Sequence, residues 1–248
     1  MVFIAMTERP TSRGLLPEVV GMGNRRLLAC EGDETPAGAP LTRIEQIRAQ
    51  ALELFARRGF GQVSMRELGL HVGIGAGSLY HHFASKEQLL FELIEELYED
   101  LLEAVVMTAT GSPTSSLRAL LHAHIDLHEQ RRLHFLMAEQ ESRCLSAEYQ
   151  QQVRQMRASY EDKFLLRLQA AGAAAPMPML KATVKGLVAW LNSLPGWSED
   201  CALPAEQMRA LVIAMAQGAL SGVLKPSQPW LDSAIVVPLR LADAASQD

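Results

Sequence analysis

The chain has 248 residues, of which 48% are hydrophobic and 21% charged, and its net charge is −5. This composition excludes a wholly disordered or low-complexity protein and is typical of a soluble globular chain large enough to bury a sizeable core. No run of 18 apolar residues occurs and residues 1–6 are too short for a signal peptide, so we expect no membrane association. The three cysteines are scattered, which fits the reducing cytoplasm.

The first 40 residues show no hydrophobic period and carry four prolines and five glycines, which predicts a disordered arm over residues 1–40. Helical signals begin at Thr42. Thr42 with Glu45 and Ser64 with Glu67 have the spacing of capping boxes, in which a hydroxyl and a carboxylate three residues apart satisfy the free N–H groups of a helix start. Both positions therefore predict the beginning of a helix.

A third capping box, Ser85 with Gln88, is predicted to open a long helix with one apolar side. Further helices are predicted at about 115–129, 133–142, 147–171, 178–193 and 204–221. Because no alternating strand pattern appears, the fold class is predicted to be all-α. We expect an N-terminal three-helix domain over 41–88, a second helical domain over 89–222 and an irregular tail over 223–248.

The segment from Ser64 to Phe83 carries the chemistry that indicates function. It contains two short helical stretches joined by a tight glycine-containing turn, the arrangement of a helix-turn-helix. Leu79 and Phe83, four residues apart, mark the inner face of the second helix, which leaves the opposite face free to enter a DNA major groove. Residues 42–90 carry a net charge of +2, whereas residues 91–248 carry −6, so one end of an acidic protein attracts nucleic acid.

The run from Gly77 to Phe83 (GSLYHHF), followed by Ser85-Lys86-Glu87, resembles the signature of the N-terminal domain of TetR-family transcriptional regulators. Residues 115–221 are similar, less specifically, to the C-terminal domain of a TetR subgroup that includes regulators responding to acyl-CoA thioesters. The resemblance implies that the helix-turn-helix domain over 41–88 binds DNA. It also implies that the domain over 89–222 binds an effector and dimerises.

The resemblance and the side-chain chemistry together predict the DNA contacts. Tyr80 and Lys86 match the family's phosphate contacts, a phenol donor and a cation. Thr42 and Ser64 lie at helix N-termini, where backbone N–H groups favour a phosphate, and Arg66 is a further candidate for phosphate or base contact. The small and polar residues at the start of the second helix, where the backbone approaches DNA and side chains reach base edges, complete the set: Ala76, Gly77, Ser78 and His81.

The second domain holds a candidate effector pocket of polar, aromatic and adaptable side chains: His124, His128, Met137, Tyr160, Phe164 and Trp190. We expect such residues mostly to form packed core, and a pliable hydrophobic pocket is the second interpretation. His124 and His128, four apart on one helix face, chelate a metal only if His134 or a carboxylate converges on them. We predict no metal and no cofactor, and the alternative function is a metal-binding helical-bundle enzyme that uses these three histidines.

The last two predicted helices have more apolar residues than one small body needs, which predicts a dimer interface at Leu187, Leu191, Leu211, Met215 and Leu220. The leading hypothesis is a homodimeric, non-enzymatic repressor that binds an inverted-repeat operator in double-stranded DNA. A small hydrophobic effector, with acyl-CoA thioesters as a candidate class implied by the resemblance, would release it. The sequence leaves open whether the protein represses or activates.

Overall fold

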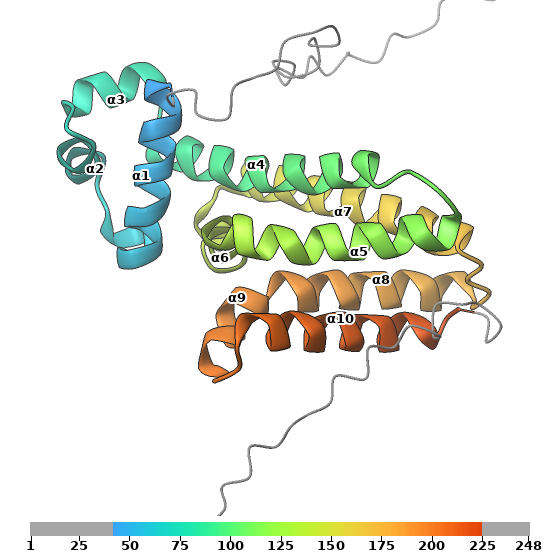
Figure 1. The fold of residues 1–248 in the computed structure, drawn as a ribbon. Helices are drawn as coiled ribbons and strands as arrows, with labels where there is room; N and C mark the ends of the chain where they lie inside the picture. The colour runs from blue at the N-terminus through green and yellow to red at the C-terminus, as the bar shows by residue number, and fades with distance from the viewer. Residues whose placement is uncertain (1–41, 225–248) are drawn as a thin grey trace, which may run out of the picture. The chain divides into compact units, whose positions relative to one another are not determined.

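The computed structural model of the chain describes residues 42–224. The arm predicted over residues 1–40 and, apart from Val223 and Leu224, the tail predicted over 223–248 lie outside the described residues. Within residues 42–224 the regular structure is helical, with one isolated bridge between Ala173 and Leu224 (Figure 1). The prediction of an all-α fold is confirmed.

The helices of the described segment follow in chain order: α1 (Arg43–Arg58), α2 (Met65–Val72), α3 (Ala76–His82), α4 (Lys86–Met107), α5 (Pro113–Gln130), α6 (Arg132–Gln140), α7 (Ala147–Ala170), α8 (Met177–Asn192), α9 (Leu194–Trp197) and α10 (Ala205–Ser221). Three short 3-10 turns lie between them: η1 (Phe60–Gln62), η2 (Ser142–Cys144) and η3 (Ser198–Asp200). Among the described residues, no helix has the length and apolar character needed to cross a membrane.

Two of the three predicted capping boxes are complete. The Thr42 hydroxyl accepts from the Glu45 N–H while the Glu45 carboxylate accepts from the Thr42 N–H, and Ser64 and Glu67 repeat this arrangement. The third prediction was only half right. The Ser85 hydroxyl does accept from the backbone N–H three residues on, but the returning side chain accepts from the residue before Ser85 rather than from Ser85 itself.

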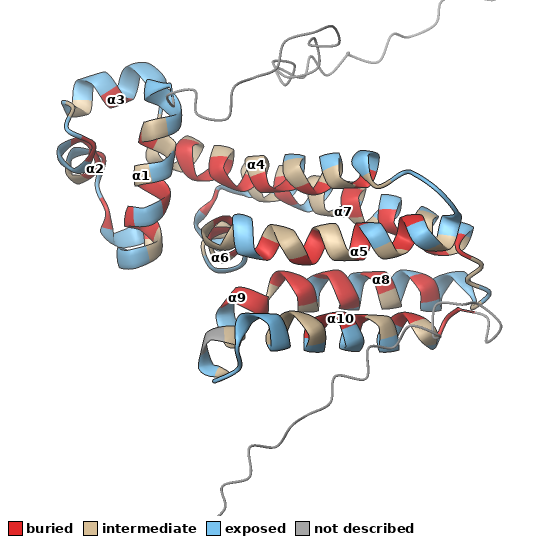
Figure 2. Ribbon diagram, in the orientation of Figure 1, coloured by how far each residue is buried: buried red, intermediate tan, exposed pale blue. Residues whose placement is uncertain are grey.

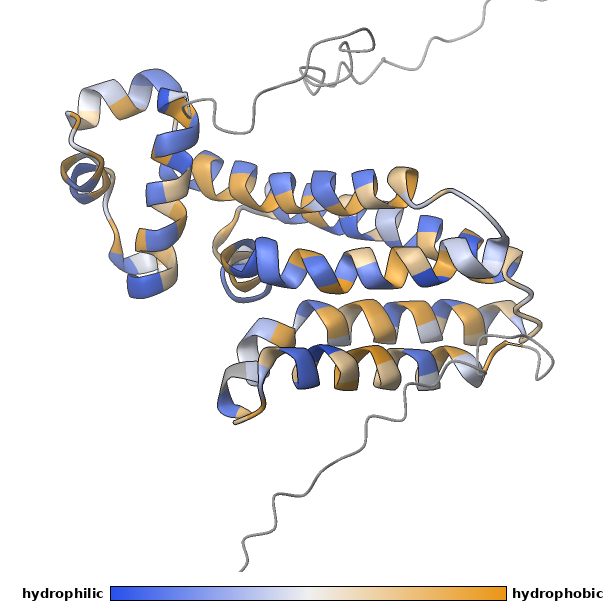
Figure 3. Ribbon diagram, in the orientation of Figure 1, coloured by the Kyte–Doolittle hydropathy of each residue, from blue (hydrophilic) through white to orange (hydrophobic). Residues whose placement is uncertain are grey.

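Apolar faces turned inward hold the helices together. Figure 2 shows buried residues along one side of each long helix, and Figure 3 shows that these positions are the hydrophobic ones. In α1–α3 the innermost side chains are at most 1% exposed, and burial of each such side chain stabilises the fold by about 1.5–3 kcal/mol. The large ones are Ile47, Phe55, Leu68 and Leu79, and Phe83, directly after α3, is buried to the same degree.

The connection between α1–α3 and the remaining helices is a packed one. α4 contacts α1 and also α5, α6 and α7, and α6 contacts α1 directly. The buried residues of α1–α10 belong to one continuous hydrophobic cluster. A shift of α6 or α4 therefore reaches α1 through side-chain packing.

Candidate functional site

The turn between α2 and α3 depends on two glycines. Gly73 ends α2 with a φ of +75° in the left-handed region that favours glycine. Gly69, inside α2, lies directly beneath the turn: a Cβ at this position would be 2.8 Å from the Ile74 carbonyl oxygen and 3.2 Å from the Ala76 nitrogen. No local sequence pattern marks Gly69, because its role depends on how α3 packs against α2. Its small size sets how closely α3 approaches α2.

α3 separates its buried and exposed residues as predicted. Leu79 and Phe83 are buried, whereas Ser78, Tyr80 and His81 are exposed, Tyr80 with 53% of its surface accessible. Gly77 is also exposed and Ala76 is half-buried. Polar donors and small residues thus share the outward face of a short helix whose inward face is fixed in the core. This is the geometry of a recognition helix, which places side chains and backbone against base edges and phosphates.

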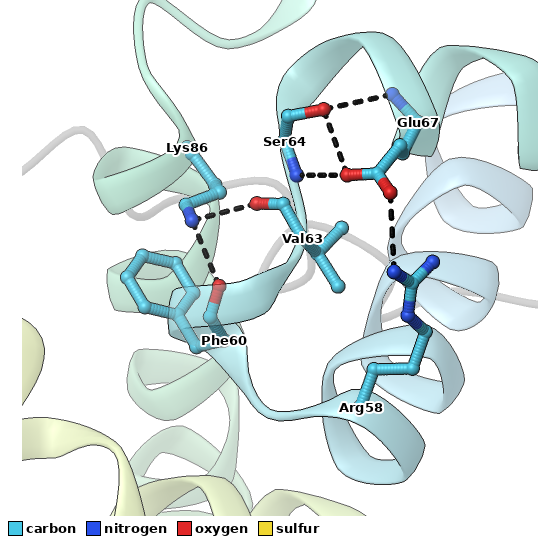
Figure 4. A network of polar contacts seen from close by, with 6 residues as sticks. All are labelled: Arg58, Phe60, Val63, Ser64, Glu67 and Lys86. Atoms are coloured by element: carbon cyan, nitrogen blue, oxygen red, sulfur yellow. Dashed lines mark hydrogen bonds and ion pairs between the residues drawn. The ribbon is translucent and has the colours of Figure 1, made fainter.

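Lys86, at the first position of α4, braces the turn before α2 (Figure 4). Its ammonium group donates to the carbonyl oxygens of Phe60 at 2.8 Å and of Val63 at 2.7 Å, and it lies 4.1 Å from the centroid of the Phe60 ring. Burial lowers the pKa of Lys86. The structure therefore gives Lys86 a structural role that the sequence did not reveal, and its predicted phosphate contact stays a prediction.

We expect Lys86→Met to lower the free energy of unfolding by about 1–3 kcal/mol, because two carbonyl oxygens lose a charged donor. Urea denaturation of the purified chain measures this loss. The salt dependence of DNA binding then separates the two roles. The slope falls by about 0.9 for each Lys86 that neutralises a phosphate, or about 1.8 for a bound dimer, and is unchanged if Lys86 only stabilises the fold. An unchanged free energy of unfolding would contradict the stabilising role of the Lys86 hydrogen bonds.

The predicted phosphate contacts at the helix N-termini are exposed but already engaged. The Ser64 hydroxyl donates to the Glu67 carboxylate and its backbone N–H does the same, while Arg58 pairs with that carboxylate (Figure 4). These hydrogen bonds, first among them the one from the Ser64 backbone, lower the pKa of Glu67. Thr42 is held in the same way by its own capping box, whereas Arg66 is simply exposed. A phosphate at α2 would have to displace or share the Glu67 carboxylate.

The predicted effector residues come together as a buried aromatic cluster. His124 Nδ1 lies 2.7 Å from the hydroxyl oxygen of Tyr160, and the His124 ring stacks on His128 with centroids 5.3 Å apart. His128 in turn stacks on Phe135 of α6 at 3.7 Å. Asn192 makes the second polar contact of the His124 ring: its amide nitrogen donates to His124 Nε2 at 3.3 Å. Burial lowers the pKa of His124 to about 3 and that of His128 to about 2, so both rings are neutral.

Most of the predicted pocket residues pack as core. Met137, Tyr160 and Phe164 are at most 1% exposed, as is His124, and Trp190 stacks on Trp197. A pocket of about 270 Å³ lies beside the cluster, and of the six predicted residues only His128 lines it. The other five predicted residues lie outside this pocket, and their role in effector binding stays a prediction.

The arrangement of the histidines does not support the metal-enzyme alternative. His134 Nε2 lies 3.6 Å from a carboxylate oxygen of Glu96 on α4, while His124 and His128 are stacked ring on ring rather than aimed at one point. Within residues 42–224, no group of three or more histidine, cysteine or acidic residues is placed to hold a metal ion. The three histidines of the predicted ligand set therefore do not converge: His134 contacts Glu96, whereas His124 and His128 stack on each other.

The predicted dimer residues divide into two groups. Leu187, Leu191 and Leu220 are at most 4% exposed and face the core of the single chain, and their place in a dimer interface stays a prediction. Leu211 and Met215, both on α10, are 41% and 48% exposed. The helical period marked α8 and α10 as apolar, but only the packed structure separates the residues that face the protein's own core from those that face outward.

A helix-turn-helix whose reading face is exposed, joined to a larger helical body, defines a DNA-binding regulator. Two family models match the chain: bacterial regulatory proteins of the TetR family over residues 47–93, and a tetracyclin repressor-like C-terminal domain over residues 110–220. The chain belongs to the TetR family of DNA-binding transcriptional regulators.

Characterised relatives and solved structures agree with this family. The chain is 32% identical over 116 residues to the transcriptional repressor KstR2 of Mycolicibacterium smegmatis, and 29% identical over 114 residues to KstR2 of Mycobacterium tuberculosis. These matches cover 46% and 45% of this chain, and 56% and 57% of the relatives. The chain thus spans little more than half the length of the curated relatives it matches.

Two solved structures illustrate the shared fold. KstR2 of Mycobacterium tuberculosis superposes with a TM-score of 0.63 at 23% identity, covering 76% of this chain and 98% of that one. AibR, solved in complex with isovaleryl coenzyme A and operator DNA, superposes with a TM-score of 0.60 at 22% identity, covering 70% of this chain and 97% of that one. At these identities the likeness concerns the fold.

Proposed function

We propose that this protein is a homodimeric transcriptional repressor that binds an inverted-repeat operator through α3 and is released by a small hydrophobic effector. The observation that carries the proposal is the exposed face of α3, where Ser78, Tyr80 and His81 stand above the buried Leu79 and Phe83. The relatives described as repressors support the sign of regulation. We place the DNA-binding domain at residues 41–88 and the effector-binding and dimerisation domain at 89–222, in a protein that acts in the cytoplasm.

Operator symmetry follows from the dimer. Two recognition helices bind successive major grooves on one side of a duplex when they lie about 34–36 Å apart. The exposed Leu211 and Met215 of α10 offer an apolar face to the partner, and α8 adds small exposed residues at Ala182, Gly186 and Ala189 that allow close approach. We propose that α8 and α10 of two copies form the interface.

Effector control needs a path from the helical body to α3. Glu141, which follows α6, accepts a hydrogen bond from the backbone N–H of Phe60 at 3.2 Å, and Glu87 of α4 accepts one from the Ser146 backbone N–H before α7. An effector that moves α6 therefore pulls on the segment between α1 and α2. It changes DNA affinity only by its difference in affinity for the two states, typically about 1–3 kcal/mol. An acyl-CoA thioester is one candidate, because AibR was solved with isovaleryl coenzyme A.

Binding of the purified chain to the DNA upstream of its own gene tests the proposal. We expect Tyr80→Phe to weaken binding by at least about tenfold, because an exposed hydroxyl that donates to a phosphate contributes about 1.5–3 kcal/mol. Tyr149→Phe is the matched control, since that ring stacks on Phe91 between α4 and α7. Equal affinities of the Tyr80→Phe variant and the native chain, measured by fluorescence anisotropy, would argue against α3 as the reading helix.

A further inference from the structure

A pocket of about 270 Å³ opens where the end of α5 meets α9, η3 and the start of α10. Its walls are mostly aliphatic, and Figure 2 shows buried residues on α5 and α9, whereas the start of α10 is exposed or half-buried. The walls include Ile125, Leu194, Leu203, Met208 and Val212. Ligand pockets for drug-sized molecules span about 300–1,000 Å³, so the occupant is a compact molecule with an apolar body.

His128 lines this pocket and is, among its lining residues, the buried side chain whose polar atoms have no hydrogen-bond partner in the described part of the chain. Its side chain is 8% exposed, and neither ring nitrogen has a hydrogen-bond partner among the residues that the structure describes. A buried donor or acceptor without a partner costs about 1–3 kcal/mol. The ring stacks on Phe135 and His124, and it can turn without breaking a hydrogen bond.

The charges around the opening select against anions. Glu129 is exposed at the rim, and Arg209 is already paired with Asp126, its Nε donating to the carboxylate at 3.0 Å. The lining residues thus carry one charge of each sign, and the positive one is already neutralised by Asp126. Neither this balance nor the volume suits a whole coenzyme A thioester with its phosphates.

We propose that this pocket binds an uncharged, compact, largely apolar molecule with one hydroxyl or amide group, which forms a hydrogen bond with His128. The inference rests on the proposed function, since it identifies the effector class of the same regulator. The ligand gives His128 the partner that the protein does not supply, and the aliphatic walls bury its body.

The position of the pocket explains how a bound ligand changes the affinity of the protein for DNA. His128 stacks on Phe135 of α6 with ring centroids 3.7 Å apart, and α6 contacts α1. When His128 turns toward a ligand, it leaves the face of Phe135, and α6 loses one of its contacts with α5. The hydrogen bond between Glu141 and the Phe60 N–H then transmits the change to the segment before α2.

Three naphthalene probes test the ligand class on the full chain: 2-naphthol, naphthalene and 2-naphthoate. By isothermal titration calorimetry at pH 7, we expect 2-naphthol to bind at least about tenfold more tightly than either of the others. Equal affinities for 2-naphthol and naphthalene, or tighter binding of 2-naphthoate, would overturn the proposal. So would displacement of 2-naphthol by isovaleryl coenzyme A.

Variants locate the site. His128→Phe keeps the stacking on Phe135 and is expected to abolish the preference for 2-naphthol over naphthalene. His122→Phe makes the same change on the same helix outside the pocket and should retain the preference. Ala205→Trp fills the opening from α10 and should abolish binding of both probes, which covers the case in which His128→Phe fails to fold. Retained preference in both His128→Phe and Ala205→Trp would refute the site.

DNA binding separates this inference from the function on which it rests. Saturating 2-naphthol is expected to lower the operator affinity of the native chain by about 5–150-fold and to leave that of Ala205→Trp unchanged. A native chain that never binds the upstream DNA would contradict the proposed function. A chain that binds DNA but is insensitive to 2-naphthol would contradict only the effector class proposed here.

Discussion

Lowering the pH from 7 to 5 is expected to reduce the free energy of unfolding by about 4 kcal/mol through His124 and His128 alone. Burial lowers their pKa from the ordinary value of 6.5 to about 3 and about 2. At a pH between the folded and the unfolded pKa values, both histidines bind protons in the unfolded chain and stay neutral in the folded chain. Stability is therefore unaffected by these groups well above pH 6.5 and is lost progressively as the pH falls below it.

Other ionisable groups change the total pH dependence of the free energy of unfolding, but not the part contributed by His124 and His128. Burial raises the pKa of Glu95 and Glu99 on α4, so these side chains gain protons more readily when folded and oppose the loss at low pH. Glu67 and Glu96, whose pKa values are lowered by hydrogen bonds, add to the loss as the pH approaches their own range. Comparing a histidine variant with the native chain separates the contribution of that histidine from the contributions of these carboxylates.

His128→Phe provides that comparison, because phenylalanine preserves the stacking on Phe135 and removes a buried polar group without a partner. Urea denaturation at pH 7 should find the variant at least as stable as the native chain, by up to about 1–3 kcal/mol, because the unpartnered polar group is removed. At pH 5 it should be more stable than the native chain by about 2 kcal/mol relative to pH 7. A difference that stays constant with pH would mean that His128 is charged or solvated in the folded protein.

Local signals in the sequence were sufficient for the helices but not for their short interruptions. Thr42 and Ser64 are spaced from their carboxylates as helix starts require, and this geometry acts within a few residues, so α1 and α2 were predicted with their caps. α9 and the 3-10 turns were missed, because four or fewer residues hold no period. Pro195 in α9 gave no distinguishing signal.

Contacts between residues that are far apart in the chain could not be predicted from the sequence. Hydrophobic periodicity marks a face as apolar without saying what covers it, and for this reason the sequence did not show that Leu187 and Leu191 face the core of their own chain. The family signature likewise marked Lys86 as a phosphate contact, whereas its hydrogen bonds to Phe60 and Val63 depend on how η1 folds against α4. The residues of α3 were predicted correctly as exposed because their period and the turn before them were both local.

Two alanine substitutions in the helix-turn-helix should have opposite effects on stability. In Gly69→Ala the added Cβ would lie 2.8 Å from the Ile74 carbonyl oxygen, and because the neighbouring atoms are backbone, α3 must move away from α2. We expect a loss of about 1–3 kcal/mol in the free energy of unfolding. Operator affinity should also fall by at least about tenfold, since misplacement of the reading helix weakens each half-site of the dimer.

Gly77→Ala makes the same chemical change in the exposed face of α3, where nothing lies within 4 Å of the added Cβ. Replacing glycine inside a helix stabilises it by up to about 1 kcal/mol, so the folded chain should be equally or more stable. If the backbone of α3 approaches DNA as proposed, the added methyl group nevertheless lowers operator affinity, because it occupies the space between Gly77 and the duplex. Thermal denaturation and fluorescence anisotropy on the same samples measure both quantities. Undiminished operator affinity in Gly77→Ala would place this turn of α3 away from the groove and move the reading surface toward Tyr80 and His81.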